Sequence, residues 1–126
     1  MTAAALFCLL SSNESLVAAT AEEMYLEALA HERELRSLGH AFVALTEWRD
    51  AADRYESITR KYPGSEFGDN ALWQAAGLAL AAFDREGSEV DRSNGTRLLT
   101  LLAHDYPSSP LVPRISERLN CLLYTS

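Results

Sequence analysis

The sequence is poor in the residues from which disulfides, metal sites and tight turns are built. Its 126 residues include two cysteines, three histidines, four prolines and six glycines. Cys8 and Cys121 lie near opposite ends of the chain and lack the spacing of a metal or redox motif, so they define no compartment. The longest early apolar stretch, residues 3–10, is too short to span a membrane.

Basic residues are also scarce. Eleven Lys and Arg face 18 Asp and Glu, which gives a net charge of −7 and an isoelectric point near 4.9. This balance argues against a nucleic-acid-binding surface. The basic residues are scattered among acidic ones, which argues against a patch for anionic membranes. With 48% apolar and 23% charged residues, the chain is predicted to form one globular domain with a modest core.

The patterns typical of enzymes are missing as well. The stretch HERE that begins at His31 lacks the second histidine of a zinc-binding helix. We therefore expect His31, His40 and His104 to be solvated surface residues. Glu32 and Glu34 point to different faces of a helix and do not form a carboxylate pair. The sequence has no glycine-rich phosphate loop and no nucleophile elbow, so it predicts no catalytic, metal-binding or cofactor-binding residue.

Both ends of the chain require separate interpretation. Residues 1–21 place an apolar stretch before Ala19-Thr20-Ala21, which resembles a secretory signal and its cleavage site. No Lys or Arg precedes that stretch, so a helical arm is the alternative. Residues 121–126, CLLYTS, resemble a translated sequencing-adapter tail, and we expect them to be non-native. The domain that remains is residues 22–120.

Apolar residues recur at helical spacing along this domain, and no sustained alternation predicts a strand. We expect helices over residues 21–38, 41–62, 67–85 and about 92–104, and a last helix that starts near Ser109 with this serine as its cap. The helix at 67–85 has almost no polar face and is predicted to be central. The predicted core contains Tyr55, Trp73, Leu80, Phe83, Leu98 and Leu102.

Aromatic residues allow two interpretations. They could line a ligand groove or fill the core between helices, and their helical spacing among apolar neighbours favours the core. The residues concerned are Trp48, Tyr55, Tyr62, Trp73 and Tyr106, of which Trp48 is the least clearly buried because charged residues flank it. The Glu and Arg side chains of residues 22–36 are expected to form a solvated face, and a surface for a partner is the alternative. Asn94-Gly95 is expected to be a turn.

A helix break recurs along the chain. A shift of 44 positions places Tyr62-Pro63 on Tyr106-Pro107 and Ser65 on Ser109. Pro63 disfavours helical geometry at Tyr62, and Gly64 permits the turn. Ser65 or Asp69 can cap the helix that follows. The repeated break therefore predicts two antiparallel helical hairpins that stack because neither buries its apolar face alone.

This pattern resembles the tetratricopeptide-like repeats of bacterial envelope proteins, in which a Tyr/Phe-Pro-x-Ser turn joins two helices. The ordinary repeat has about 34 residues, so an offset of 44 implies an insertion, which we place at residues 84–94. The Trp and Leu-Gly start of the full repeat is not matched. The resemblance implies an all-α fold of about five helices, with antiparallel hairpins stacked in a right-handed superhelix.

Two stretches carry a closer resemblance. YESITRKYPGSEFGDNALWQAAGLALAAF and RLLTLLAHDYPSSPLVPR look like the helical region that precedes the catalytic domain in some bacterial N-acetylmuramoyl-L-alanine amidases, which are zinc enzymes. The resemblance covers residues 22–119. It carries over no zinc ligand, because the metal-binding domain would lie beyond this chain. It implies a location in the periplasm or cell envelope.

Three functional hypotheses follow. We expect a non-catalytic scaffold that binds a protein or peptidoglycan-associated partner, without nucleic acid, cofactor or membrane span, as the front portion of such an amidase. The alternative is a standalone periplasmic adaptor of the outer-membrane assembly or cell-division coordinator type. An enzyme complete within these residues has no supporting motif. The natural reading frame past Asn120 would distinguish the first two.

Overall fold

The protein is an all-helical stack, as predicted. The structure is a computed structural model and describes the backbone of residues 18–39 and 42–124. Within these ranges the chain forms five α-helices and a short 3-10 helix and no strand. The elements are α2 (Ala21–Ser37), α3 (Leu45–Lys61), α4 (Gly68–Glu86), α5 (Glu89–Asp105), η1 (Val112–Arg114) and α6 (Ile115–Tyr124). Cys8, His40 and most of the leader-like segment 1–21 lie outside the described residues.

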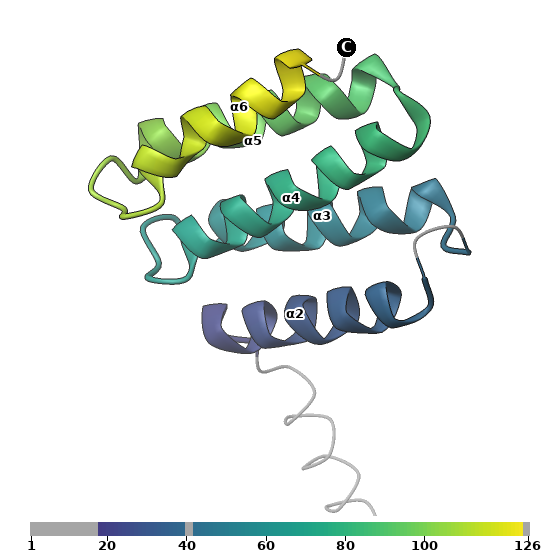
Figure 1. The fold of residues 1–126 in the computed structure, drawn as a ribbon. Coiled ribbons are helices and arrows are strands. Elements are labelled where there is room, and N and C mark those ends of the chain that lie inside the picture. Colours follow the sequence, from purple (N-terminus) through teal and green to yellow (C-terminus); the bar gives the residue numbers. More distant parts are fainter. Residues whose placement is uncertain (1–17, 40–41, 125–126) are drawn as a thin grey trace, which may run out of the picture.

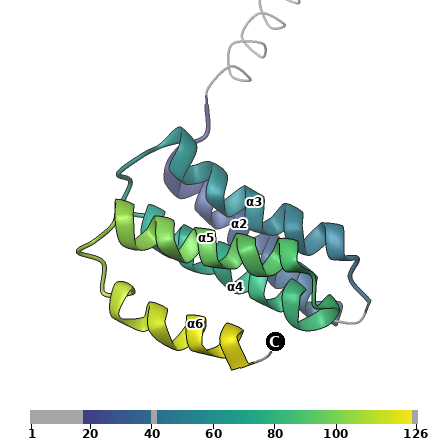
Figure 2. The same ribbon diagram turned by 90° about the horizontal axis from the view of Figure 1, so that it is seen from above.

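Successive helices run antiparallel and pack as neighbours. Figure 1 shows α2 at one end of the stack and α5 and α6 at the other, with α3 and α4 between them. Seen from above, α6 lies along one edge of the molecule (Figure 2). The most extensive packing joins α4 to α3 and to α5. The position of α4 between them agrees with its almost wholly apolar sequence, since such a helix needs neighbours on several sides.

Small residues allow this close packing around α4. Ala71, Ala75 and Ala76 are completely buried. On α5, Gly95 lies against α4, where a Cβ atom would come within 3.1 Å of Leu80 Cδ2. Asn94 and Gly95 lie within α5, so the predicted turn at this point is wrong. A larger residue at Gly95 would require the Leu80 side chain to shift, so the glycine favours the close approach of α5 to α4.

Helix ends depart from the predicted ones at three places. The second helix begins at Leu45, because Ala44 is extended with φ −62° and ψ 145°. The polar residues 84–94 form no insertion loop, since only Gly87 and Ser88 separate α4 from α5. The extra length of the 44-residue offset thus lies in the helices, which have 19 and 17 residues. The last helix begins at Ile115 after η1, and its backbone continues to Tyr124.

The hydrophobic core includes most of the predicted residues and one that was expected to be less buried. Tyr55, Trp73, Phe83, Leu98 and Leu102 are buried, and Leu80 is partly exposed. Trp48 is only 1% exposed, compared with 8% for Trp73. The expected order of burial is therefore wrong. The charged residues next to Trp48 in the sequence suggested an exposed ring. The ring is buried instead, and Arg36 of α2 lies over it with its guanidinium 5.4 Å from the ring centre.

Candidate functional site

The two Tyr-Pro turns share one backbone geometry. Tyr62 has φ −129° and ψ 69°, and Tyr106 has φ −130° and ψ 58°. The amide of each tyrosine donates to the carbonyl four residues earlier, at 2.8 and 2.9 Å, and the amide of each later serine donates to the tyrosine carbonyl. The turns differ at their third residue. Gly64 has φ +80°, whereas Ser108, like every other described non-glycine residue, has no positive φ.

The turn serines close the turn itself and do not cap a helix. Ser65 Oγ accepts a hydrogen bond from the Phe67 amide, and Ser109 Oγ accepts one from the Leu111 amide, each at 3.1 Å. The N-cap of α4 is Phe67, which makes no side-chain capping bond, and α6 begins six residues after Ser109. The predicted capping roles of Ser65 and Ser109 are therefore wrong. Ser109 instead donates to Asp69 Oδ2 at 2.7 Å, which links the two turns.

Each of the two tyrosines contacts the start of the helix that precedes its own helix in the chain. Tyr62, at the end of α3, donates its hydroxyl hydrogen to the Ala19 carbonyl just before α2. Tyr106, at the end of α5, packs on Gly68 at the start of α4, where a Cβ atom would meet the phenolic oxygen at 1.9 Å. Burial raises the pKa of Tyr106, against a hydrogen bond from the Gly64 backbone that lowers it. Equivalent tyrosines thus link the second helix of each pair, α2–α3 or α4–α5, to the start of the first. The Tyr-Pro turn therefore follows each of these pairs, whereas it was predicted to lie within each hairpin.

A buried carboxylate joins the first three helices. Glu32 of α2 is 6% exposed. Its Oε1 accepts from the Tyr55 hydroxyl at 2.7 Å and from Gln74 Nε2 at 3.3 Å, and its Oε2 accepts from Arg36 Nε at 2.7 Å. Burial, followed by the hydrogen bond to Glu32, raises the pKa of Tyr55 far above its ordinary value. The solvated face predicted for residues 22–36 is therefore wrong at Glu32.

A local signal for this burial exists in the sequence. Glu32 lies four residues after Ala28 and three before Leu35, and both of these residues are buried. Positions with this spacing share one helix face. The apolar stripe of α2 therefore passes through Glu32, and a carboxylate in such a stripe indicates hydrogen-bond donors on the neighbouring helices.

The two described histidines differ in their exposure to solvent. His104 is exposed, with Nδ1 2.8 Å from Asp105 Oδ1. His31 is only partly exposed, and its Nε2 atom is buried without a hydrogen-bond partner among the described residues. The predicted solvated position therefore agrees with His104 and is wrong for His31. Neither histidine belongs to a metal-binding group, since the described part of the chain contains no cluster of three or more His, Cys, Asp or Glu side chains placed to hold an ion.

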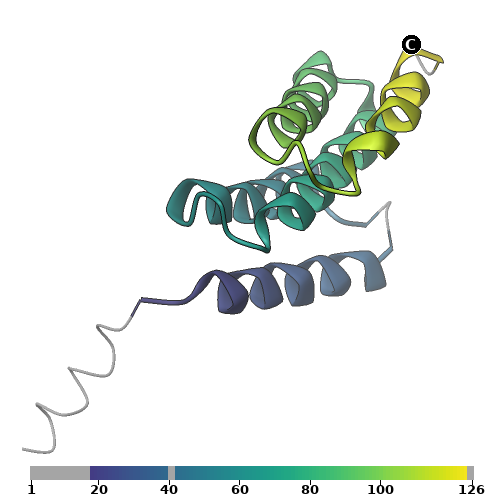
Figure 3. The same cartoon turned by 90° about the vertical axis from the view of Figure 1, so that its left-hand side faces the viewer.

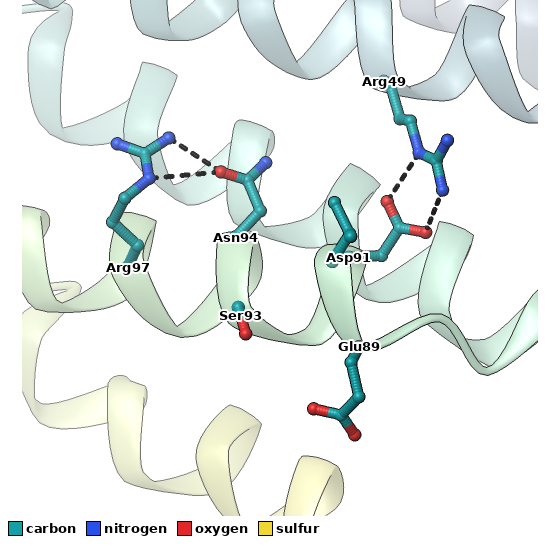
Figure 4. A pocket seen from close by; sticks show the side chains of 7 residues that line it. Arg49, Glu89, Asp91, Ser93, Asn94 and Arg97 are labelled. Carbon is teal, nitrogen blue, oxygen red and sulfur yellow. Dashed lines mark hydrogen bonds and ion pairs between the residues drawn. The ribbon is translucent and has the colours of Figure 1, made fainter.

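A pocket between α3 and α5 is lined by charged side chains that form ion pairs. It is open, has a volume of about 580 Å³, and is lined by Arg49, Glu89, Val90, Asp91, Ser93, Asn94 and Arg97. Arg49 binds both oxygens of Asp91 at 2.9 and 2.8 Å, and Asp91 is 2% exposed (Figure 4). Arg97 binds both oxygens of Glu56 at 2.7 Å and lowers the pKa of that carboxyl. These ion pairs join α3 to α5, so the charged residues of this pocket have a structural role.

A second surface lies along α4, which is flanked by α2 and α6. Asn70, Gln74, Gly77 and Ala81 form a stripe at helical spacing and are not fully buried. We call this stripe the α4 face. Gln74 reaches Glu32 of α2, and a Cβ atom at Gly77 would lie 3.5 Å from the guanidinium nitrogens of Arg118 on α6. Figure 3 shows α4 between α2 and α6. The face therefore has a polar residue at its border on each side, Glu32 on α2 and Arg118 on α6.

Comparisons with known proteins identify no family. Neither the protein-family models, nor the curated proteins, nor the solved structures contain a match to the chain. In the part of the chain that the structure describes, no helix has both the length and the apolar character needed to cross a membrane. The geometry of the helix stack is accordingly the basis for a functional proposal.

Proposed function

We propose that residues 22–120 form a non-catalytic helical repeat scaffold of the tetratricopeptide-like kind, which binds a protein or peptidoglycan-associated partner on the α4 face. The observation that supports this proposal is the recurrence of one construction. In both α2–α3 and α4–α5, a helix pair ends in a Tyr-Pro turn whose tyrosine braces the start of the pair. Stacked repeats present continuous surfaces, and repeat proteins use such surfaces for binding.

Rigidity supports this role. The Glu32 hydrogen bonds connect α2 with α3 and α4, and the Arg49–Asp91 and Arg97–Glu56 pairs connect α3 with α5. Of the two helices that flank the α4 face, α2 is thereby held in place before any partner arrives, and α4 itself is packed between α3 and α5. A preorganised surface loses less conformational entropy on binding, which favours affinity.

The cellular context is a proposal that rests on the sequence resemblance alone. We propose that the scaffold is exported to the cell envelope and precedes the catalytic domain of a peptidoglycan amidase. A standalone periplasmic adaptor is the alternative. Sequencing the natural gene past the codon for Asn120 decides between them, since a downstream zinc domain supports the amidase and a stop codon supports the adaptor.

Site-directed photo-crosslinking tests the binding role. A benzoyl-phenylalanine placed at Asn70 or Ala81 samples the α4 face, and the same residue at Thr96 or Thr100 samples exposed positions of α5. In cells that carry the natural gene, we expect one discrete crosslinked species from the two α4 positions and none from the α5 positions. A lack of crosslinks at the α4 positions, or equal crosslinking at all four, would contradict binding at this face.

A further inference from the structure

Two arginines at the border of the α4 face differ from Arg49 and Arg97, which form ion pairs between α3 and α5. Arg114 and Arg118 lie four residues apart, and their guanidinium carbons are 5.1 and 3.4 Å from the centre of the Trp73 ring. Arg118 also donates from Nη1 to the Trp73 carbonyl at 2.6 Å. No carboxylate within the described residues forms an ion pair with either arginine, whereas Arg49 and Arg97 each hold one.

This absence is costly for Arg118, which is partly buried. Burial, together with the like charge of Arg114, lowers the pKa of Arg118 to about 10. The charge of Glu32 opposes this shift, but the oxygens of Glu32 already accept hydrogen bonds from Tyr55, Gln74 and Arg36. Charged groups removed from water ordinarily have a counterion. The positive charge at this site is not neutralised by a described carboxylate, so the site attracts an anion.

We propose that Arg114 and Arg118 bind a carboxylate in an acidic peptide segment of the scaffold's partner. The inference rests on the proposed function, because the two arginines border the α4 face. A guanidinium presents a planar fork of donors that matches a carboxylate. Trp73 holds Arg118 in a fixed orientation through the cation–π contact, and Gly77 beside it has no side chain to obstruct the approach.

The net charge of the protein makes the test specific. At −7, the chain as a whole repels an acidic peptide, so binding must come from a local cationic site. The probe is a fluorescein-labelled hexaglutamate peptide, with hexaglutamine as its neutral counterpart, titrated with the full chain in fluorescence anisotropy at low salt. We expect saturable binding of hexaglutamate only, weakened by added salt.

Charge-removing variants then locate the site. Arg118→Gln and Arg114→Gln are each expected to weaken hexaglutamate binding about tenfold or more, because each removes a charge-assisted hydrogen-bond donor. Arg60→Gln is the matched control, since it changes the net charge equally and Arg60 is already paired with Asp53 and Glu56. It should bind as the parent does. Thermal melts report folding, and if Arg118→Gln unfolds, the exposed Arg114 decides the question alone.

Three results would overturn the proposal. The first is no hexaglutamate binding by the parent protein, and the second is equal binding by the Arg114, Arg118 and Arg60 variants. The third is displacement of the peptide by inorganic phosphate at a much lower concentration than by acetate, which would assign the site to phosphate. The scaffold role is judged separately, because crosslinking from Asn70 and Ala81 that persists in the Arg114→Gln variant leaves that role intact while the carboxylate site fails.

Discussion

Glu32 shows how one side chain can determine the position of three helices. Its two oxygens accept hydrogen bonds from residues of α2, α3 and α4 while the residue is almost fully buried. A buried carboxylate is stabilising only while its hydrogen bonds are complete, and removing its acceptor capacity leaves buried donors without partners. The attachment of α2 to the stack therefore depends in part on this residue, beside the apolar packing of Ala28 and Leu35.

Replacing this carboxylate tests the dependence. Glu32→Gln keeps the shape but turns one acceptor oxygen into an NH2 donor, which must face either the Tyr55 hydroxyl or Arg36. We expect a loss of about 1–3 kcal/mol in the free energy of unfolding, measured by urea denaturation. Glu34→Gln is the control, because Glu34 is exposed on the same helix, and its effect should stay within about 0.5 kcal/mol. Equal effects of the two variants would contradict the role of Glu32.

The two tryptophans give a second residue-scale prediction. Trp48 is 1% exposed and Trp73 is 8% exposed, so Trp48→Ala should destabilise at least as much as Trp73→Ala. Each is expected to cost about 3–5 kcal/mol, the range for removing a buried tryptophan. Chemical denaturation of both variants measures this. A Trp48→Ala variant as stable as the parent would show that the ring contributes little to the core.

At the scale of elements, the turns determine where the chain reverses. Both have the same bonding pattern at an offset of 44 residues, but only the first requires a positive φ, at Gly64. The first turn joins α3 to α4, which are the most closely packed pair of helices. A failure at this turn would therefore disturb the centre of the stack, whereas a failure at the second would affect the lighter packing of α6.

This difference predicts unequal effects of equivalent substitutions. Replacing Pro63 and Gly64 together by alanine places a side chain at φ +80° and removes the proline stop. We expect a loss of about 1–3 kcal/mol and a fraction of domain-swapped dimer, because a continuous helix would expose the α4 core residues.

The second turn supplies the control for this variant. Pro107→Ala combined with Ser108→Ala removes a proline without introducing a strained residue, so the variant should remain monomeric with a smaller loss. Size-exclusion chromatography and urea denaturation of both double variants measure the two effects. A monomeric Pro63/Gly64 variant with parental stability would show that the Tyr-Pro break is incidental to the fold.

At the scale of the whole molecule, the polar groups are used to assemble the helices. The Arg49–Asp91 and Arg97–Glu56 ion pairs join α3 to α5, and the Glu32 hydrogen bonds join α2 to α4. A chain whose charged side chains hold elements together keeps its surfaces in a fixed relation, which is the property that a binding scaffold requires.

The scaffold proposal predicts the metal content of the whole chain. We expect the purified protein to hold far less than one zinc per chain and to release no product from peptidoglycan. The described residues contain no suitable group of ligands, and zinc sites in proteins require three or four such side chains. Elemental analysis after dialysis measures the first quantity and a dye-release assay the second. One tightly held zinc per chain would contradict the proposal.

The sequence by itself determined the features that depend on neighbouring residues. The all-α class, the central place of α4 and the turns at Pro63 and Pro107 follow from apolar periodicity and from the stereochemistry of proline and glycine, which act over a few residues. The predicted helix ends were least accurate before α3 and α6, where extended or 3-10 backbone precedes the helix.

Only the tertiary structure decided which polar and aromatic residues meet. Glu32 and Tyr55 are 23 positions apart in the chain, Glu32 and Gln74 are 42 apart, and Arg118 and Trp73 are 45 apart. Such contacts depend on how whole helices stack, which no local pattern of charge or hydrophobicity specifies. A charged residue within a helix has the same local sequence whether its neighbour in space is water, a tyrosine hydroxyl or the face of a tryptophan, and the packing of α2, α4 and α6 selects among these.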